Sequence, residues 1–318
     1  MALVEELRVE QRPRRRLAEE RLTGVALPQP RPRLIPLWAE RLAHSPTAVV
    51  GGSILCLHLL IALVGPLVAP YPFTEFHIAD RLQAPSAAYL FGTDQFGRDV
   101  FSRVLYGAQG ILLLATTATA LGLVLGVTVG TVAGYYGGKL DEALMRTMDA
   151  LMSLPSLLLA MLILTMVGPA TQNIVLGIAV VFTPPVARIV RSVVLGLKSA
   201  EYVEAARLRG ESGLYIMSRE ILPNALGPII VEGAIRISYA ILLGASLGFL
   251  GLGVQPPAAD WGLMVSDGRN YILVAPWMVL FPSAAIASLV VGANLFADGL
   301  SRLLEVDSAS RPADSRTS

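Results

Sequence analysis

The sequence predicts an all-α, polytopic membrane protein that crosses the membrane six times and keeps both termini in the cytoplasm. Its 318 residues are 54% hydrophobic and only 15% charged, and the mean hydropathy is +0.61. Soluble proteins carry about 25% charged residues, so an ordinary soluble domain is excluded. Two further observations support the prediction: six long apolar runs, and a one-sided distribution of lysine and arginine.

Residues 1–34 are expected to form a basic, disordered cytoplasmic tail. They are rich in arginine and proline and contain no long apolar run, a composition that cannot build a hydrophobic core. Residues 35–107 are expected to hold the first transmembrane helix and a polar external loop. No short hydrophobic segment with a cleavage site precedes that helix, so we expect it to remain as a membrane anchor.

Residues 108–300 are expected to form the main transmembrane domain, and residues 301–318 a cytoplasmic tail. A helix needs about 20 apolar residues to cross about 30 Å of hydrocarbon. The six runs of suitable length, the first of which precedes this domain, are 47–69, 110–133, 144–167, 173–190, 227–250 and 277–297. The third run contains Asp149 and Pro155, and neighbouring helices can satisfy the backbone groups that such a proline frees.

The distribution of basic residues predicts the orientation. With both termini inside, 20 of the 25 lysines and arginines fall on the cytoplasmic side, four fall outside, and Arg236 lies within the fifth span. Cytoplasmic loops of membrane proteins carry such an excess. The net charge of only +1 gives no field that would attract nucleic acid.

A stripe of glycines runs along the second span, where Gly122, Gly126, Gly130 and Gly134 recur every fourth residue. Small residues at this spacing lie on one helix face and let two helices approach closely in lipid. We interpret the stripe as a helix-packing surface rather than a ligand site.

Ionisable residues inside the spans are expected to be paired, because a lone charge in the membrane is costly. Glu232 and Arg236 are four residues apart, which predicts an ion pair, with contact to solute as the alternative. Asp149 is expected to meet a helix end or a basic residue near the cytoplasmic side. His58 has no second ligand nearby and is interpreted as a packing residue.

The segment 199–224 between the fourth and fifth spans is too long and too patterned for a passive connection. Ser199 is expected to cap a short helix, which Gly210 ends with a left-handed turn. Ser212 is expected to cap a second helix that stops before Pro223. The result is an elbow of two helices joined at a glycine, lying along the inner face of the membrane.

The exposed side of this elbow is expected to include Ala205 and Ala206, which are small enough to let another surface dock closely. We interpret the elbow as a protrusion that a cytoplasmic partner grips. The alternative is an amphipathic helix that rests on the lipid headgroups.

The elbow resembles the EAA motif of ABC-importer permeases, in which EAA is followed after three residues by Gly and later by Leu-Pro. The matching residues are Glu204, Ala205, Ala206, Gly210, Leu222 and Pro223. In that family this segment is the coupling helix, which sits in a groove of the ATP-hydrolysing subunit. The resemblance therefore implies a role in ATPase coupling for these six residues. Glu220 departs from the generic motif, which has Ile there.

Other motifs resemble the C-subunit permeases of dipeptide, oligopeptide and nickel importers, in order along about residues 35–307. They include GTDQFGRD at 92–99, AGYYGG at 133–138, FLGLG at 249–253 and DGL at 298–300. Gly244 departs from the family, which often has Glu before FLGLG. The resemblance implies the type I ABC-importer permease fold in the cell inner membrane.

The resemblance also implies the function and the partners. The chain is expected to translocate dipeptides or oligopeptides handed over by an external solute-binding protein. It is expected to pair with a homologous second permease subunit in the lipid bilayer and to be driven by two cytoplasmic ATPase subunits. Nickel and glutathione importers share the pattern, so the solute stays open.

The sequence contains no recognisable catalytic constellation, so we do not expect an enzyme. In the nearest approach to a phosphate loop, Ala133 stands where Gly is required and Leu140 replaces the Ser or Thr that binds magnesium. ATP and Mg are therefore expected on the partner ATPase subunits, with no cofactor and no metal in this chain. The rival interpretations are an ion-coupled secondary transporter, which predicts inverted repeats and broken helices, and a non-transporting membrane scaffold.

Overall fold

The computed structural model describes residues 45–309, with side chains as far as residue 303, and this part of the chain is helical without a β-strand. The predicted tail at 1–34 and the end of the predicted tail at 301–318 lie outside the described residues. The longer helices are α3 (Pro46–Val68), α4 (Val100–Tyr136), α5 (Gly138–Met152), α6 (Ser156–Val167), α7 (Thr171–Leu197), α10 (Leu222–Phe249) and α12 (Trp277–Ala309). The shorter elements are η1 (Ile78–Asp80), α8 (Glu201–Leu208), α9 (Gly213–Tyr215), the π-helix η2 (Ile216–Ile221), α11 (Trp261–Gly268) and η3 (Arg269–Tyr271).

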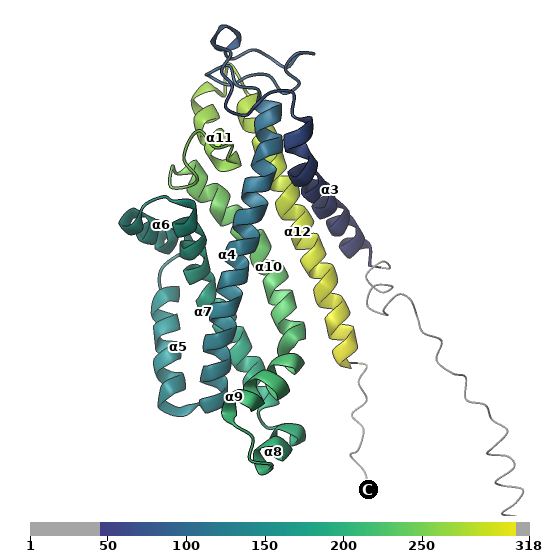
Figure 1. Ribbon diagram of the computed structural model, residues 1–318, viewed down its shortest axis with the longest axis vertical. Coiled ribbons are helices and arrows are strands. Elements are labelled where there is room, and N and C mark those ends of the chain that lie inside the picture. The colour runs from purple at the N-terminus through teal and green to yellow at the C-terminus, as the bar shows by residue number, and fades with distance from the viewer. Residues whose placement is uncertain (1–44, 310–318) are drawn as a thin grey trace, which may run out of the picture. The chain divides into compact units, whose positions relative to one another are not determined.

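Five of the six predicted spans are confirmed as helices long and apolar enough to cross a membrane. They are α3, α4, α7, α12 and the continuous helix Gly213–Phe249, which contains α10 (Figure 1). The second span starts earlier than predicted. Asp99 caps α4 by accepting a hydrogen bond of 2.8 Å from the Ser102 backbone N–H, so the helix begins at Val100 instead of near residue 110.

The predicted span 144–167 is not one continuous helix. The chain forms α5 and α6, which meet at an angle of 91° across Ser153–Pro155. Proline has no N–H for the helix ladder and disfavours helical geometry at Leu154 before it, which explains the break. The pair amounts to at most one span, so the described residues hold five or six spans.

The helix α4 packs along α7 through the predicted glycine stripe, which is confirmed as a packing surface. A Cβ atom added at Gly130 would lie only 2.4 Å from the Ala187 carbonyl oxygen, and one at Gly126 would lie 2.5 Å from Val186 Cβ. The glycines therefore allow the two backbones to approach closely.

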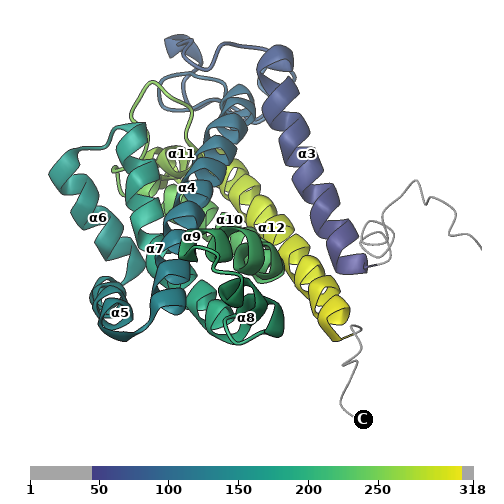
Figure 2. The ribbon, with the colours of Figure 1, turned by 60° about the horizontal axis from the view of Figure 1, so that its bottom comes forward.

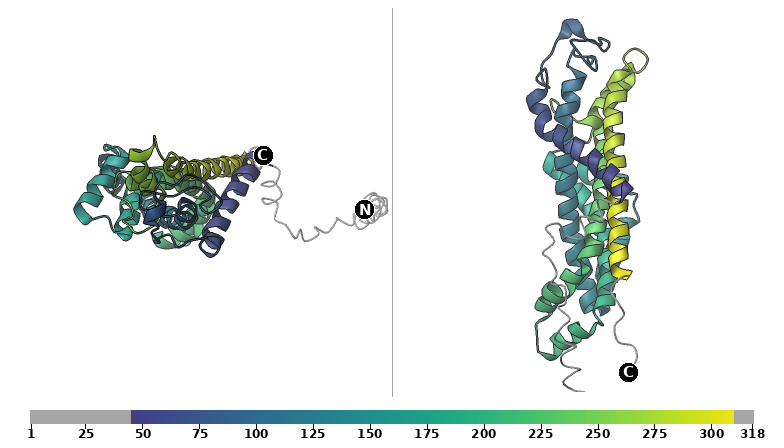
Figure 3. Two further views of the ribbon diagram at one scale, coloured as in Figure 1. Left: turned by 90° about the horizontal axis from the view of Figure 1, so that it is seen from above. Right: turned by 90° about the vertical axis from the view of Figure 1, so that its right-hand side faces the viewer.

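On the other side of the bundle, α3 runs beside α12, while α5 and α6 lie at the opposite edge (Figure 2). The view from above shows the same grouping (Figure 3). The predicted packing role of His58 is confirmed: its side chain is buried, and Nε2 lies 3.2 Å from the Ser288 hydroxyl of α12.

A cap of loops and α11 lies at one end of the bundle, opposite the end that carries α8 (Figure 1). Two indole groups fix this cap to the long helices. Trp261 Nε1 donates to the Val104 carbonyl at 2.9 Å, and Trp277 Nε1 donates to the Thr93 carbonyl at 3.0 Å. The GTDQFGRD segment thus belongs to a rigidly packed end of the molecule.

Candidate functional site

The predicted elbow is present between α7 and α10, but two of its expected boundaries are wrong. Ser199 does not cap α8, because the helix starts after Ala200 and the Ser199 hydroxyl donates back to the Gly196 carbonyl at 3.3 Å. The second helix does not stop before Pro223 either. Pro223 lies inside the helix that continues from Gly213 to Phe249, directly after the π-helix η2, where the Leu222 N–H donates to the Met217 carbonyl.

The turn of the elbow is as predicted. Gly210 adopts φ of +80°, a left-handed conformation that side chains with a Cβ avoid, and a Cβ atom added there would have no neighbouring atom within 4 Å. Ser212 caps α9 by accepting a hydrogen bond of 3.3 Å from the Tyr215 N–H. The backbone conformation, and not crowding, is what requires glycine at position 210.

The two alanines of the motif differ in their surroundings. Ala205 is exposed, as expected, and so is Glu204, whereas Ala206 is fully buried, so its predicted place on the exposed side is wrong. Ala206 and Val203 lie one turn apart and face inward together, because residues three apart share one face of a helix.

A compact apolar cluster anchors the elbow to α7. Its fully buried members come from α7, α8 and η2, and they are Val186, Val190, Val194, Val203, Ala206, Ile216 and Ile221. The Arg207 guanidinium also lies 5.7 Å from the centre of the Tyr135 ring at the end of α4. A force applied to α8 therefore reaches the long helices through packed side chains.

The tip of the elbow presents two leucines that the motif did not single out. Leu208 is 90% exposed and Leu214 is 73% exposed, and they flank the Gly210 turn on either side. These two leucines offer apolar surface to whatever contacts the turn, whether a partner protein or the lipid headgroups. A leucine has no sequence signal that separates it from core residues, which is why the sequence alone did not reveal them.

Glu220, the departure from the generic motif, connects the two arms of the elbow. Arg209 at the end of α8 lies 3.4 Å from Glu220 Oε1 on η2 and 3.7 Å from Glu211 Oε1. Partial burial and the Glu220 carboxylate raise the pKa of Tyr202 on α8. The segment η2 leads directly into Leu222 and Pro223, so α8 and the start of α10 are joined through it.

The expected ion pairs within the bundle are present. Arg236 Nε lies 2.5 Å from Glu232 Oε1, and Asp149 pairs with Arg188 of α7. The second departure from the family, Gly244, is a packing position: a Cβ there would lie 2.6 Å from Leu114 Cδ2 of α4. A longer side chain at this position would have to move the end of the Leu114 side chain.

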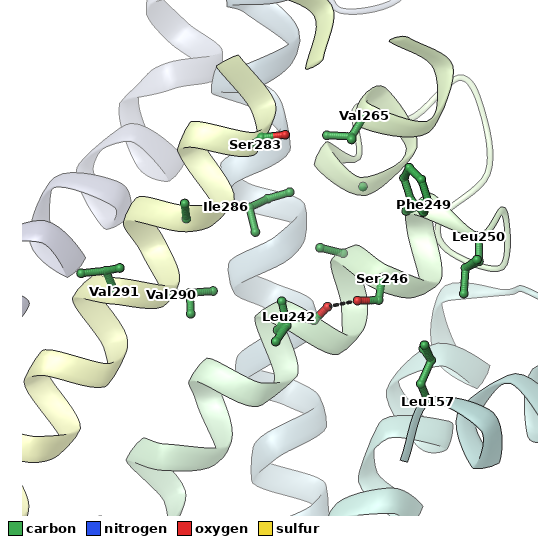
Figure 4. Close-up of a pocket in the computed structure, with 13 residues that line it drawn as sticks. Leu157, Leu242, Ser246, Phe249, Leu250, Val265, Ser283, Ile286, Val290 and Val291 are labelled. Carbon is green, nitrogen blue, oxygen red and sulfur yellow. Dashed lines mark hydrogen bonds between the residues drawn. The ribbon is translucent and has the colours of Figure 1, made fainter. Parts of the chain in front are cut away.

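A groove of about 620 Å³ lies between α10, α11, α12 and the start of α6 (Figure 4). Its lining is almost entirely apolar, with Leu242 and Phe249 on α10 facing Ile286 and Val290 on α12. A second hollow of about 410 Å³ continues from it, since both share Leu157, Leu242 and Ser246. Such concave apolar surfaces with few polar groups are the usual form of small-molecule sites.

Residues 126–307 match the family described as binding-protein-dependent transport system inner membrane component. This range is more than half of the chain and contains the whole elbow. The chain belongs to this family. Residues 37–85 match a second family, the N-terminal transmembrane domain of oligopeptide transport permease C. The family resemblance drawn from the motifs is thereby confirmed, and the chain is a multi-pass inner membrane permease component.

Curated relatives of this permease share about 40% of its residues. It is 42% identical over 271 residues to the dipeptide transport system permease protein DppC of Alkalihalophilus pseudofirmus, covering 84% of this chain and 89% of the relative. It is 42% identical over 264 residues to the probable D,D-dipeptide transport system permease protein DdpC of Escherichia coli, covering 83% and 89%. The glutathione transport system permease protein GsiD of Pectobacterium atrosepticum is 38% identical over 272 residues, covering 84% and 90%.

Proposed function

We propose that this chain is the membrane-spanning permease subunit of an ATP-binding-cassette importer for dipeptides or oligopeptides. An external solute-binding protein delivers the peptide, a homologous second permease completes the path, and two cytoplasmic ATPase subunits that bind ATP and Mg supply the energy. Both termini lie in the cytoplasm. The similarity to relatives named for dipeptide transport supports the peptide class.

The elbow is the observation that carries this proposal. It protrudes at one end of the bundle (Figure 1), exposes Leu208 and Leu214 around a rigid glycine turn, and is anchored by a buried cluster to α7. A protrusion of this kind can transmit motion only if its tip is gripped and its base is fixed. The exposed leucines offer a surface to grip, and the buried cluster fixes the base.

The six motif residues have different roles: some contact the ATPase subunit, one forms the turn, and others anchor the elbow to the bundle. Glu204 and Ala205 belong to the exposed surface that meets the ATPase, and Gly210 supplies the turn. Ala206 anchors α8 inside the buried cluster. Leu222 and Pro223 start α10, so displacement of the elbow on ATP hydrolysis tilts α10 together with α7 and alternates access to the path.

The alternative function, ion-coupled secondary transport, has one observation in its favour, the broken pair α5–α6. Membership of a binding-protein-dependent family weighs against it. Glutathione remains an alternative solute within the same mechanism, because one of the relatives is named for it.

Reconstitution tests the proposal. Vesicles carrying this chain, its second permease and the ATPase subunits should accumulate a radiolabelled dipeptide when ATP and the solute-binding protein are supplied. Vesicles without ATP should not. Uptake driven by an ion gradient in the absence of the ATPase subunits would support the secondary transporter and contradict the proposal.

A further inference from the structure

We propose that Arg236 forms a carboxylate-binding site in the hollow of about 410 Å³ that continues from the groove, and that the transported solute is recognised there by a free carboxylate. The inference rests on the proposed transport function. It adds that the solute carries a free carboxylate and that Arg236 binds this carboxylate. Four observations carry it: the position of Arg236 near the middle of α10, its place in the lining of the hollow, the hydrogen-bond donors that Glu232 leaves free, and the apolar surroundings.

Arg236 lies near the middle of α10 (Leu222–Phe249). At 1.5 Å rise per residue it is about 20 Å from either end of that helix. An ionisable side chain at such depth marks either a structural pair or a pathway, because its desolvation is costly. Arg236 meets both descriptions, since it is paired with Glu232 and also lines the hollow of about 410 Å³.

The two members of the ion pair differ in their access to the hollow. The Glu232 side chain is 6% exposed and is not among the lining residues, whereas the Arg236 side chain is 17% exposed and lines the hollow. Among the residues that line this hollow and the larger groove that continues from it, Arg236 is the single charged one. The other lining residues are apolar apart from Ser156, Ser246, Ser283 and the Tyr239 hydroxyl.

The guanidinium keeps donors free for a ligand. Its Nε and Nη2 atoms both lie 2.5 Å from one atom, Glu232 Oε1, and within the described residues Nη1 has no hydrogen-bond partner. A guanidinium carries five N–H donors in a planar fork that matches the two oxygens of a carboxylate. The rings of Tyr239 and Phe182, centred 5.4 Å and 5.7 Å from the guanidinium carbon, hold the group in place.

A zwitterionic peptide fits this site better than a metal cation or a neutral solute. Glu232 already neutralises Arg236, so a bound carboxylate must bring its own compensating charge, which the peptide ammonium group provides. The peptide side chains then lie against the apolar lining. A bare divalent cation would be repelled by the guanidinium and would find no carboxylate, imidazole or thiol among the lining residues.

The test compares a dipeptide that has a free C-terminal carboxylate with the same dipeptide as its C-terminal amide. Uptake is measured in the reconstituted complex with the solute-binding protein saturated by each peptide. Differences in the affinity of this protein for the two peptides then do not affect the uptake rates. The variants are Arg236→Gln and the double variant Glu232→Gln with Arg236→Gln, which leaves no buried charge unpaired. Arg146→Gln is the matched control, because Arg146 pairs with Glu142 at the same i, i+4 spacing but on the exposed surface of α5.

We expect the wild type and Arg146→Gln to transport the free peptide at least about tenfold faster than the amide. Both Arg236 variants should transport the two peptides at similar rates, because uptake of the free peptide falls while uptake of the amide stays unchanged. An unchanged ratio in the variants would overturn the inference while leaving the proposed function intact. Equal loss of both peptides, or loss of assembly with the second permease, would also overturn it by showing a structural pair. Failure of the wild type to transport either peptide would contradict the proposed function itself.

Discussion

At the scale of single residues, glycine serves two separate purposes in this chain. Gly210 is required for its positive φ in open surroundings, whereas the stripe on α4 is required for close contact with α7. Both were predictable, because a motif glycine after a short helix and a four-residue repeat are visible in the sequence. The burial of Ala206 was not, because it depends on valines of α7 that lie far away in the chain.

The stripe predicts a contrast between two alanine substitutions in α4. Gly130→Ala places a Cβ 2.4 Å from the Ala187 carbonyl oxygen, so it should lower the free energy of unfolding by about 1 to 3 kcal/mol. Gly110→Ala meets no atom within 4 Å and should be neutral or slightly stabilising. Thermal unfolding of the purified subunit in detergent measures both. Equal stability of the two variants would show that the stripe is not a packing surface.

Asp260 predicts a pH dependence at the cap. Burial raises the pKa of its carboxyl to about 6 from an ordinary 3.8, although the Leu263 and Gly262 N–H groups and the Arg103 charge act in the opposite direction. The folded state thus binds the proton more tightly than the unfolded state does. Stability from this group is greatest below about pH 4 and declines as the pH rises to about 6.

Replacing Asp260 with Asn should remove that decline while preserving the helix cap. The variant should be more stable than the wild type at pH 7 by roughly 3 kcal/mol and should match it near pH 4. Thermal unfolding across this pH range measures the difference. A variant that is less stable than the wild type at pH 7 would contradict the burial argument.

At the scale of elements, hydropathy predicted where the apolar segments lie, but it did not predict where the helices begin, end or break. Five spans agree, while Pro155 divides the remaining one into α5 and α6 at 91°. Pro223 had the opposite outcome: it follows the π-helix η2, and the helix continues through it to Phe249. A proline alone does not determine which result follows; the hydrogen bonds available to the preceding turn do, and these depend on tertiary packing.

The elbow predicts that its exposed leucine is a docking residue. Leu208→Ser should weaken copurification of the ATPase subunit by at least about tenfold, because the side chain is 90% exposed at the tip of the elbow that we propose meets this subunit. Membrane insertion should be unaffected. Leu273→Ser is the matched control, since Leu273 is 95% exposed in the segment between η3 and α12, outside the elbow. Normal copurification of the Leu208 variant would remove this residue from the coupling surface.

At the scale of the whole molecule, coupling to cytoplasmic ATPase subunits is possible only if the elbow and the cap lie on opposite sides of the membrane, with the elbow inside. The basic residues predict this orientation, and the structure places the two features at opposite ends. Cysteine labelling tests it, because Cys56 is the single cysteine of the chain and can be replaced by serine.

In that background, Ala87→Cys in the loop of the cap and Ser218→Cys beside the elbow are both at exposed positions. A membrane-impermeant maleimide added to intact spheroplasts should label the first variant and not the second. After permeabilisation both should react. Labelling of the second variant in intact spheroplasts would reverse the orientation and remove the elbow from the ATPase side.

The proposed coupling of ATP hydrolysis to peptide uptake depends on the Gly210 turn, which a pair of valine substitutions tests. Gly210→Val forces a β-branched residue to φ of +80°, whereas Gly196→Val introduces the same side chain into open space on the helix α7. In the reconstituted complex, ATP-driven dipeptide uptake by the Gly210 variant should fall at least about tenfold, while the subunit still inserts and the Gly196 variant transports like the wild type. Uptake at the wild-type rate in the Gly210 variant would contradict the account.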